Sequence, residues 1–164
     1  MAPTRPAPAT SVLFVCLGNI CRSPLAEGVF AHLVRERDLA DRFEVDSAGT
    51  GAWHVGERPD PRSAEVAARH GIVLGGRARR ISPSDFERFD LVVAMDRDNM
   101  AELERLGARE NGRARLRLLR EWDPEEGDEV PDPYYGGPDG FDAVFRMVLR
   151  SCEALLDELA GPEA

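Results

Sequence analysis

The sequence has no lysine, only three cysteines and no apolar run long enough to span a membrane. The cysteines are Cys16, Cys21 and Cys152, and the opening residues do not resemble a secretion signal. An odd, small number of cysteines argues against a secreted disulfide framework, so we expect a reducing, cytoplasmic location. No second Cys/His pair follows at zinc-ligand spacing, so we expect no metal and no other cofactor.

Charge limits the kind of partner that this chain can bind. The 164 residues carry a formal net charge of −9, and all 21 basic residues are arginine. An acidic surface repels nucleic acid and anionic lipid, so we expect neither as a partner. It also repels phosphorylated substrates. Any phosphate site must therefore be local, built from backbone amides and a placed arginine.

Strand-like and helix-like segments alternate along the chain. Strands are expected at 11–15, 43–47, 91–94 and 114–119, and helices at 24–37, 61–70, 98–106 and 141–159. The Ala-Gly-Thr-Gly segment at 48–51 should end the second strand. Cys152 lies on the apolar stripe of the last helix and is interpreted as a core residue. The pattern predicts a single α/β domain over residues 11–160 after a disordered tail at 1–10. Its four-stranded parallel sheet should be doubly wound, Rossmann-like or flavodoxin-like, with helices on both faces.

In such sheets ligands bind at the carboxyl ends of strands, so the loop after the first strand is the predicted site. It runs from Cys16 through Leu17, Gly18, Asn19, Ile20, Cys21 and Arg22 to Ser23. Loop amides and the helix dipole favour an anion there, and Gly18 and Asn19 tolerate positive φ. Arg22 can grip two phosphate oxygens, and this positive field favours the thiolate of Cys16 as a nucleophile. The alternative is a structural turn with a buried Cys16.

Ser23 has two possible roles. Its hydroxyl can stabilise the sulfur of Cys16, or it can cap the helix that begins at Pro24. The two roles are compatible, and the sequence does not choose between them.

Several separated motifs occur in an order that resembles the low-molecular-weight protein tyrosine phosphatases, over nearly the whole chain after residue 10. They are Val-Cys-Leu-Gly-Asn-Ile-Cys-Arg-Ser-Pro at 15–24, Asp-Ser-Ala-Gly-Thr at 46–50, Trp53-His54, Asp60-Pro61-Arg62, Met95-Asp96 and Asp-Pro-Tyr-Tyr at 132–135. The resemblance implies hydrolysis of phosphotyrosine and aryl phosphate monoesters through a phosphocysteine. It makes Cys16 the nucleophile, Arg22 the phosphate binder and Asp132 the general acid and base. The implied partners are a phosphotyrosine protein and inorganic phosphate.

Three aromatic residues complete the predicted site. Trp53, Tyr134 and Tyr135 would wall the phosphate loop, suit a flat phenyl ring and exclude a short phosphoserine. The alternative is that these side chains only pack locally. The loop residues Leu17, Gly18, Asn19, Ile20, Cys21 and Ser23 are expected to bind phosphate or substrate beside them.

Some positions depart from the family pattern or separate its branches. Gly76 stands where many members have a histidine that supports the loop asparagine, so Asn19 needs another support, such as Ser47 or water. A threonine replaces Ile20 in a bacterial arginine-phosphatase branch, so Ile20 favours phosphotyrosine. Arsenate reductases of this fold need two further cysteines, which the chain lacks between Cys21 and Cys152.

Two further hypotheses remain at this stage. An inactive phosphate-binding relative would normally have lost one of Cys16, Arg22 and Asp132, and all three are present. Cys16 and Cys21 share one loop, so oxidants could join them in a reversible disulfide that protects the nucleophile.

Overall fold

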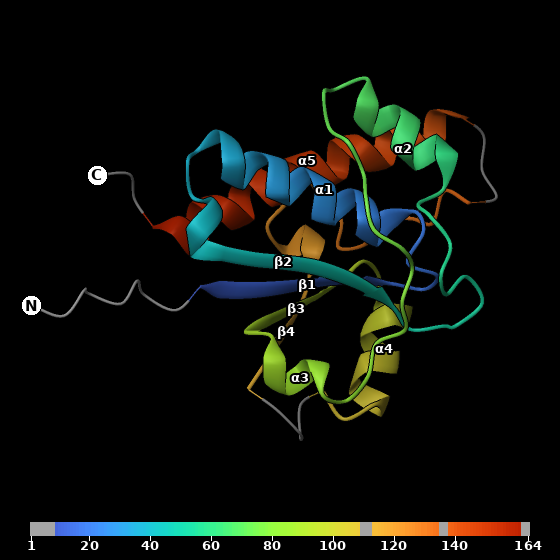
Figure 1. Ribbon diagram of the computed structural model, residues 1–164, viewed down its shortest axis with the longest axis vertical. Helices are drawn as coiled ribbons and strands as arrows, with labels where there is room; N and C mark the ends of the chain where they lie inside the picture. Colours follow the sequence, from blue (N-terminus) through green and yellow to red (C-terminus); the bar gives the residue numbers. More distant parts are fainter. Residues whose placement is uncertain (1–8, 109–112, 135–137, 162–164) are drawn as a thin grey trace, which may run out of the picture.

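The computed structural model describes residues 9–108, 113–134 and 138–161, and its centre is a four-stranded parallel sheet (Figure 1). The strands are β1 (Thr10–Cys16), β2 (Phe43–Gly49), β3 (Leu91–Ala94) and β4 (Arg115–Leu118), in the order β2-β1-β3-β4. The predicted four-stranded, parallel, doubly wound sheet is therefore confirmed. Residues 1–8 lie outside the described part, so the disordered tail stays a prediction, and β1 begins at Thr10.

Helices cover both faces of the sheet. They are α1 (Arg22–Glu36), α2 (Pro61–Ala68), α3 (Asp85–Arg88), α4 (Arg97–Arg105) and α5 (Pro138–Ala160), with single 3₁₀ turns at Ala40–Arg42 and Leu119–Glu121. Helices α1, α2 and α5 lie on one side, and α3 and α4 on the other (Figure 1). Among the described residues, no helix has the length and apolarity needed to cross a bilayer.

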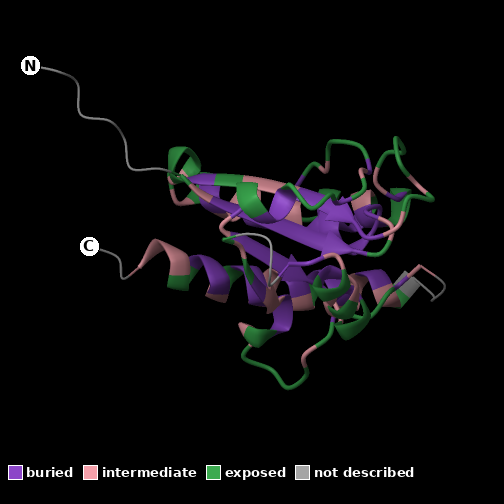
Figure 2. Ribbon diagram, turned by 90° about the horizontal axis from the view of Figure 1, so that it is seen from below, coloured by how far each residue is buried: buried purple, intermediate pink, exposed green. Residues whose placement is uncertain are grey.

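The alternation of side chains along β1 explains these two layers. Val12 and Phe14 belong to a buried cluster with residues of α1 and α5, whereas Leu13 and Val15 belong to a second cluster with residues of α3 and α4. Successive strand residues point to opposite faces, so a strand buried on both faces is apolar throughout. Figure 2 shows the strands as the buried centre of the molecule.

The order of the strands positions the functional loop. From β1 the chain crosses to β2 on one side, and it later places β3 on the other side of β1. The crossovers therefore diverge beside the carboxyl end of β1, which is the switch point at which such sheets bind ligands. The loop from Leu17 to Cys21 leaves β1 at this point.

Several elements differ from the sequence-based expectation. Strand β2 does not end at residue 47, because Ala48 and Gly49 still pair with Val15 and Cys16 of β1 and Ala48 is fully buried. Helix α5 begins at Pro138 instead of residue 141, since proline is tolerated in a first helical turn. The four-residue α3 was not predicted, because so short a helix has no periodic pattern to detect.

Helix α1 also starts earlier than expected, at Arg22 rather than Pro24. The shift places Arg22 and Ser23 in the first helical turn, directly after the loop. Their side chains are thereby fixed by helix geometry instead of loop conformation.

The apolar stripe of α5 should dominate the stability of its layer. Leu155 is fully buried, and the fully buried Cys152 confirms that this cysteine belongs to the core. We expect Leu155→Ala to lower the free energy of unfolding by about 2–5 kcal/mol, because the change leaves a cavity that the core fills only in part. Urea unfolding measures this difference. The half-buried Leu159 is the matched control, and an equal loss in Leu159→Ala would contradict the assigned packing.

Candidate functional site

The loop after β1 is held in place through its own carbonyl groups. The amide of Gly51 donates to the carbonyl oxygen of Leu17 at 2.9 Å, and that of Asp60 donates to the carbonyl oxygen of Ile20 at 2.7 Å. In contrast, the amides of Gly18, Ile20 and Cys21 meet no acceptor within the described part of the chain. Such amides at a helix N-terminus are the donors that bind anions in proteins.

Asn19 and Gly18 contribute to the turn in different ways. Asn19 has a φ of 56°, as its residue type allows, whereas Gly18 does not have the positive φ that the sequence suggested. Space at 18 is tight instead, since a Cβ there would lie 3.0 Å from Cδ2 of His54, and the imidazole would have to shift. Gly49 of β2 has a similar role, because its Cβ would meet the carbonyl oxygen of Leu17 at 2.8 Å.

The side chain of Asn19 joins three segments beneath the loop. Its Nδ2 donates to Ser23 Oγ at 2.9 Å and to Ser47 Oγ at 3.0 Å, and its Oδ1 accepts from the amide of Arg79 at 2.9 Å. Ser47 is one of the two supports that we expected in place of the family histidine. All of the hydrogen bonds that the amide group makes therefore serve to position the loop.

A half-buried glutamate continues this network behind Ser47. The hydroxyl of Ser47 donates to Glu27 Oε1 at 2.5 Å. Burial raises the pKa of Glu27, and the nearby Asp46 raises it further, against the hydrogen bond from Ser47. Gly76 and Glu27 line a small cavity of about 80 Å³ together with Asn19 and Ser47. Glu27 thus fixes Ser47, and both side chains line the cavity beside Gly76.

Cys16 lies at the end of β1, with polar groups directed at its sulfur. Its Sγ is 3.0 Å from Ser23 Oγ and accepts from the amide of Asn19 at 3.3 Å. Ser23 does not cap α1, because the cap residue is Cys21 and no side chain closes that end. Of the two roles expected for Ser23, the geometry therefore retains only contact with the sulfur.

Arg22 is buried beside the loop and is held by groups far along the chain. Its Nη1 donates to Asp96 Oδ2 at 2.5 Å and to the carbonyl oxygen of Val130 at 3.0 Å, and its Nη2 lies 3.6 Å from Asp132 Oδ2. Burial lowers the pKa of Arg22, but its interactions with Cys16, Asp96 and Asp132, including the hydrogen bond to Asp96, outweigh burial and raise the pKa. The guanidinium therefore stays cationic inside the protein.

The segment after the second 3₁₀ turn brings Asp132 over the loop. The amide of Val130 donates to the carbonyl oxygen of Met95 at 2.8 Å, and the amide of Tyr134 donates to Asp132 Oδ1 at 3.0 Å. The carboxylate of Asp132 is 39% exposed, so it remains accessible to a bound ligand while it faces Arg22.

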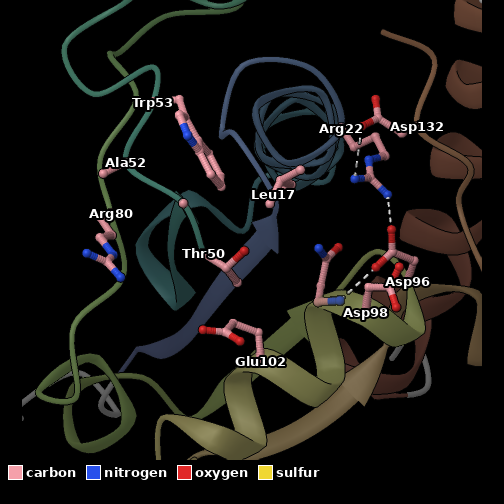
Figure 3. A pocket seen from close by; sticks show the side chains of 12 residues that line it. Leu17, Arg22, Thr50, Ala52, Trp53, Arg80, Asp96, Asp98, Glu102 and Asp132 are labelled. Atoms are coloured by element: carbon pink, nitrogen blue, oxygen red, sulfur yellow. Dashed lines mark hydrogen bonds and ion pairs between the residues drawn. The ribbon is translucent and has the colours of Figure 1, made fainter. Parts of the chain in front are cut away.

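These groups surround one cavity of about 450 Å³. It is lined by Cys16, Leu17, Gly18, Ile20, Cys21, Arg22, Trp53, His54, Asp132 and Tyr134. Figure 3 shows Trp53 and Leu17 on one side of the site, with Arg22 and Asp132 on the other. Asn19 and Ser23 do not line this cavity but lie behind it. Tyr135 lies outside the described residues.

Two site residues were missed by sequence reasoning. Asp96 follows β3, which is the neighbour of β1, and this position at the carboxyl edge of the sheet is the signal that could have identified it. His54 lines the cavity, with its Nδ1 2.8 Å from Glu57 Oε2 and its ring 6.1 Å from that of Tyr134. Its position next to Trp53 in the sequence is the signal that could have identified it.

Trp53 is 73% exposed, lines the cavity and lies against Gly51, whose Cβ would stand 1.9 Å from the indole. The indole thus packs locally and also faces the cavity, and its role as a wall for a phenyl ring stays a prediction. Cys16 and Cys21 are free thiols, and burial raises the pKa of Cys21 to about 12. A reversible disulfide between these cysteines stays a prediction.

No group of three or more His, Cys, Asp or Glu side chains in the described ranges is arranged to hold a metal ion.

Comparison with known proteins gives a consistent result. A family model described as low molecular weight phosphotyrosine protein phosphatase matches residues 11–163. A low molecular weight protein-tyrosine-phosphatase of Streptomyces coelicolor is 51% identical over 148 residues, which cover 88% of this chain and 90% of the relative.

Solved structures agree with the sequence match. A protein tyrosine phosphatase from Entamoeba histolytica has a TM-score of 0.86 at 36% identity, over 93% of this chain and 97% of that one. An arginine phosphatase of Drosophila has a TM-score of 0.87 at 38% identity, over 93% and 99% of the two chains. Agreement of this extent in sequence and in structure shows that the chain belongs to the low molecular weight phosphotyrosine protein phosphatase family.

Proposed function

We propose that this protein hydrolyses phosphotyrosine and other aryl phosphate monoesters through a phosphocysteine formed on Cys16. The observation that carries the proposal is the shared cavity in which Cys16 Sγ, the loop amides, Arg22 and Asp132 meet. Phosphoryl transfer needs positioning and electrostatic stabilisation more than covalent assistance, and amides with a guanidinium supply both.

In the first step the thiolate of Cys16 attacks phosphorus and the bond from phosphorus to the phenolic oxygen breaks. The loop amides and Arg22 hold the three remaining phosphate oxygens. Asp132 gives a proton to the leaving oxygen, since an unprotonated tyrosine leaving group would depart as a strongly basic phenolate.

In the second step water attacks the phosphocysteine, the phosphorus–sulfur bond breaks and inorganic phosphate leaves. The carboxylate of Asp132 takes the proton from this water. The sulfur regains its negative charge, which the hydroxyl of Ser23 stabilises from 3.0 Å and the amide of Asn19 from 3.3 Å. Each group returns to its starting state.

The walls of the cavity support an aryl substrate carried by a protein. Leu17, Trp53 and Tyr134 present apolar surface around the thiol, and Ile20 lines the same cavity. A phenyl ring fills such a space, and only a phosphate at the end of a long flat side chain reaches Cys16.

Phosphoarginine is the second candidate substrate, because the Drosophila structure of 38% identity is that of an arginine phosphatase. Ile20 favours phosphotyrosine over this alternative. Parallel assays on phosphotyrosine and phosphoarginine peptides of the same sequence distinguish the two, and faster turnover of phosphoarginine would overturn our assignment of the substrate.

Cys16→Ser should abolish turnover of para-nitrophenyl phosphate and of phosphotyrosine peptides, because a serine hydroxyl is a far weaker nucleophile than a thiolate. Steady-state assays with phosphate detection measure this. Cys152→Ala, which changes a buried core thiol, is the matched control and should keep the parent rate. Residual turnover near the parent rate in Cys16→Ser, or no turnover in the parent, would show that the cavity serves another purpose, such as phosphate binding alone.

Asp132→Asn should lower turnover of phosphotyrosine peptides by about 10²–10⁴-fold, as expected for loss of a general acid. The loss should be smaller for para-nitrophenyl phosphate, whose phenol is more acidic and needs less help to leave. Asp128→Asn changes a neighbouring acid that pairs with Arg97 and is the control. Equal losses on the two substrates would argue against proton transfer from Asp132.

Glu27→Gln should stabilise the protein at pH 7, because the raised pKa means that ionised Glu27 costs stability in the folded state. The favourable contribution of Glu27 is complete below its ordinary pKa and is lost as pH rises through the folded-state pKa. The gain should therefore shrink as the pH falls to about 4. Thermal unfolding of the parent, Glu27→Gln and the exposed control Glu65→Gln measures this. Destabilisation of equal size at both pH values would contradict the burial argument.

A further inference from the structure

A second cavity adjoins the first and is not used by the proposed reaction. It has a volume of about 820 Å³ and shares Leu17, Arg22, Trp53 and Asp132 with the first cavity. From this shared wall it extends to Thr50, Gly51, Ala52, Arg80, Asp96, Asp98, Asn99 and Glu102. A substrate bound at Cys16 would therefore have its neighbouring residues directly at the opening of this cavity.

One side of the second cavity is acidic. Asp96, Asp98 and Glu102 belong to α4 and the residue before it. Figure 3 shows Asp96 and Asp98 on the side opposite Ala52 and Arg80, with Glu102 at the bottom between the two sides. Asp96 pairs with Arg22, and Glu102 pairs with Arg105. Asp98 has no ion-pair partner within the described part of the chain. A carboxylate without a partner at the rim of a cavity attracts a cation.

Asn99 gives independent evidence for a ligand at this place. It is 3% exposed and lines the cavity, yet its Oδ1 is buried without a hydrogen-bond partner. Its backbone amide donates to Asp96 Oδ1 at 2.7 Å, so that bond does not involve the side-chain oxygen. Buried side-chain amides in folded proteins are nearly always paired, so an unpaired one beside a cavity marks a position where a bound group can complete the bonding.

The opposite wall suits the stem of a long side chain. Leu17 is 44% exposed and Trp53 73% exposed, and both lie between the two cavities. Arginine and lysine bury an apolar stem against such surface while their charged end meets polar groups. A guanidinium or ammonium that crosses this wall would reach Asp98 and Asn99.

We propose that the second cavity is a subsite for an arginine or lysine side chain that flanks the phosphotyrosine of the substrate. The proposal rests on the proposed function, because it is the phosphotyrosine that anchors the substrate next door. The acidic surface repels phosphorylated proteins in general. A basic residue beside the phosphotyrosine would meet the acidic subsite and offset this repulsion for substrates that carry one.

Matched phosphotyrosine peptides test the proposed subsite. They carry arginine, alanine or glutamate at each of the three positions on either side of the tyrosine. The readout is the ratio of kcat/KM for the arginine peptide to that for the alanine peptide. We expect a ratio of about three to ten at one or more positions, as partly exposed charge pairs give. The ratio should fall to about one in Asp98→Asn/Glu102→Gln and persist in Glu153→Gln, which removes an exposed carboxylate from α5.

Charge reversal gives a second, opposite readout. Asp98→Arg should make the glutamate peptide the better substrate at the position where the parent prefers arginine. The proposal is wrong if the parent has no preference for arginine at any position, or if the preference survives unchanged in Asp98→Asn/Glu102→Gln.

Equilibrium binding of the same peptides to Cys16→Ser separates this proposal from the proposed function. A three- to tenfold tighter Kd for the arginine peptide supports the subsite even if no variant turns the peptides over. Equal Kd values alongside normal hydrolysis would overturn the subsite and leave the phosphatase assignment intact.

Discussion

The side-chain amide of Asn19 is the interaction on which the site depends. It bonds to Ser23 in the first turn of α1, to Ser47 within β2 and to the backbone of Arg79. A positive φ costs a non-glycine residue about 1–2 kcal/mol, and these bonds offset that cost. Because Ser23 is held in this way, its hydroxyl stays within 3.0 Å of the thiol of Cys16. The loop, the helix start and the sulfur therefore take up their positions together.

The positive charge of the site comes from one paired arginine in an otherwise acidic protein. Arg22 is the cation inside the site, and its two terminal nitrogens have different surroundings. Nη1 is bonded to Asp96 and to the carbonyl of Val130, which fix the side chain. Among the described residues, Nη2 has only the longer contact of 3.6 Å with the partly exposed Asp132. A phosphate can therefore bind Nη2 without breaking the ion pair with Asp96 that positions the guanidinium. Asp96 also balances the charge of the buried Arg22, in a protein whose formal net charge is −9.

Features set by residues close together in the chain could be predicted from the sequence, whereas contacts between distant residues could not. Alternating apolar runs predicted the sheet, and the spacing from Cys16 to Arg22 predicted the loop, because both are set by residues close in the chain. The bond between Arg22 and Asp96 joins residues 74 positions apart, and no spacing rule reveals it. For the same reason β2 was expected to stop early: Ala48 and Gly49 are poor strand formers alone, and pairing with β1 keeps them extended. The role of Gly18 depended on His54, another distant contact.

Near Gly76, a backbone amide supports Asn19 in place of the histidine side chain that the family resemblance led us to expect. With no histidine at this position, the amide of Arg79 bonds to Asn19 Oδ1. That segment is fixed because Arg79 pairs with Asp46 and Asp85, and because its carbonyl accepts from the amide of Gly49 at 2.8 Å. Glu27 holds Ser47 from the other side. Support spread over several bonds is harder to remove than one ring. The position of the loop should therefore depend strongly on the ion pairs of Arg79, which hold the segment that follows Gly76.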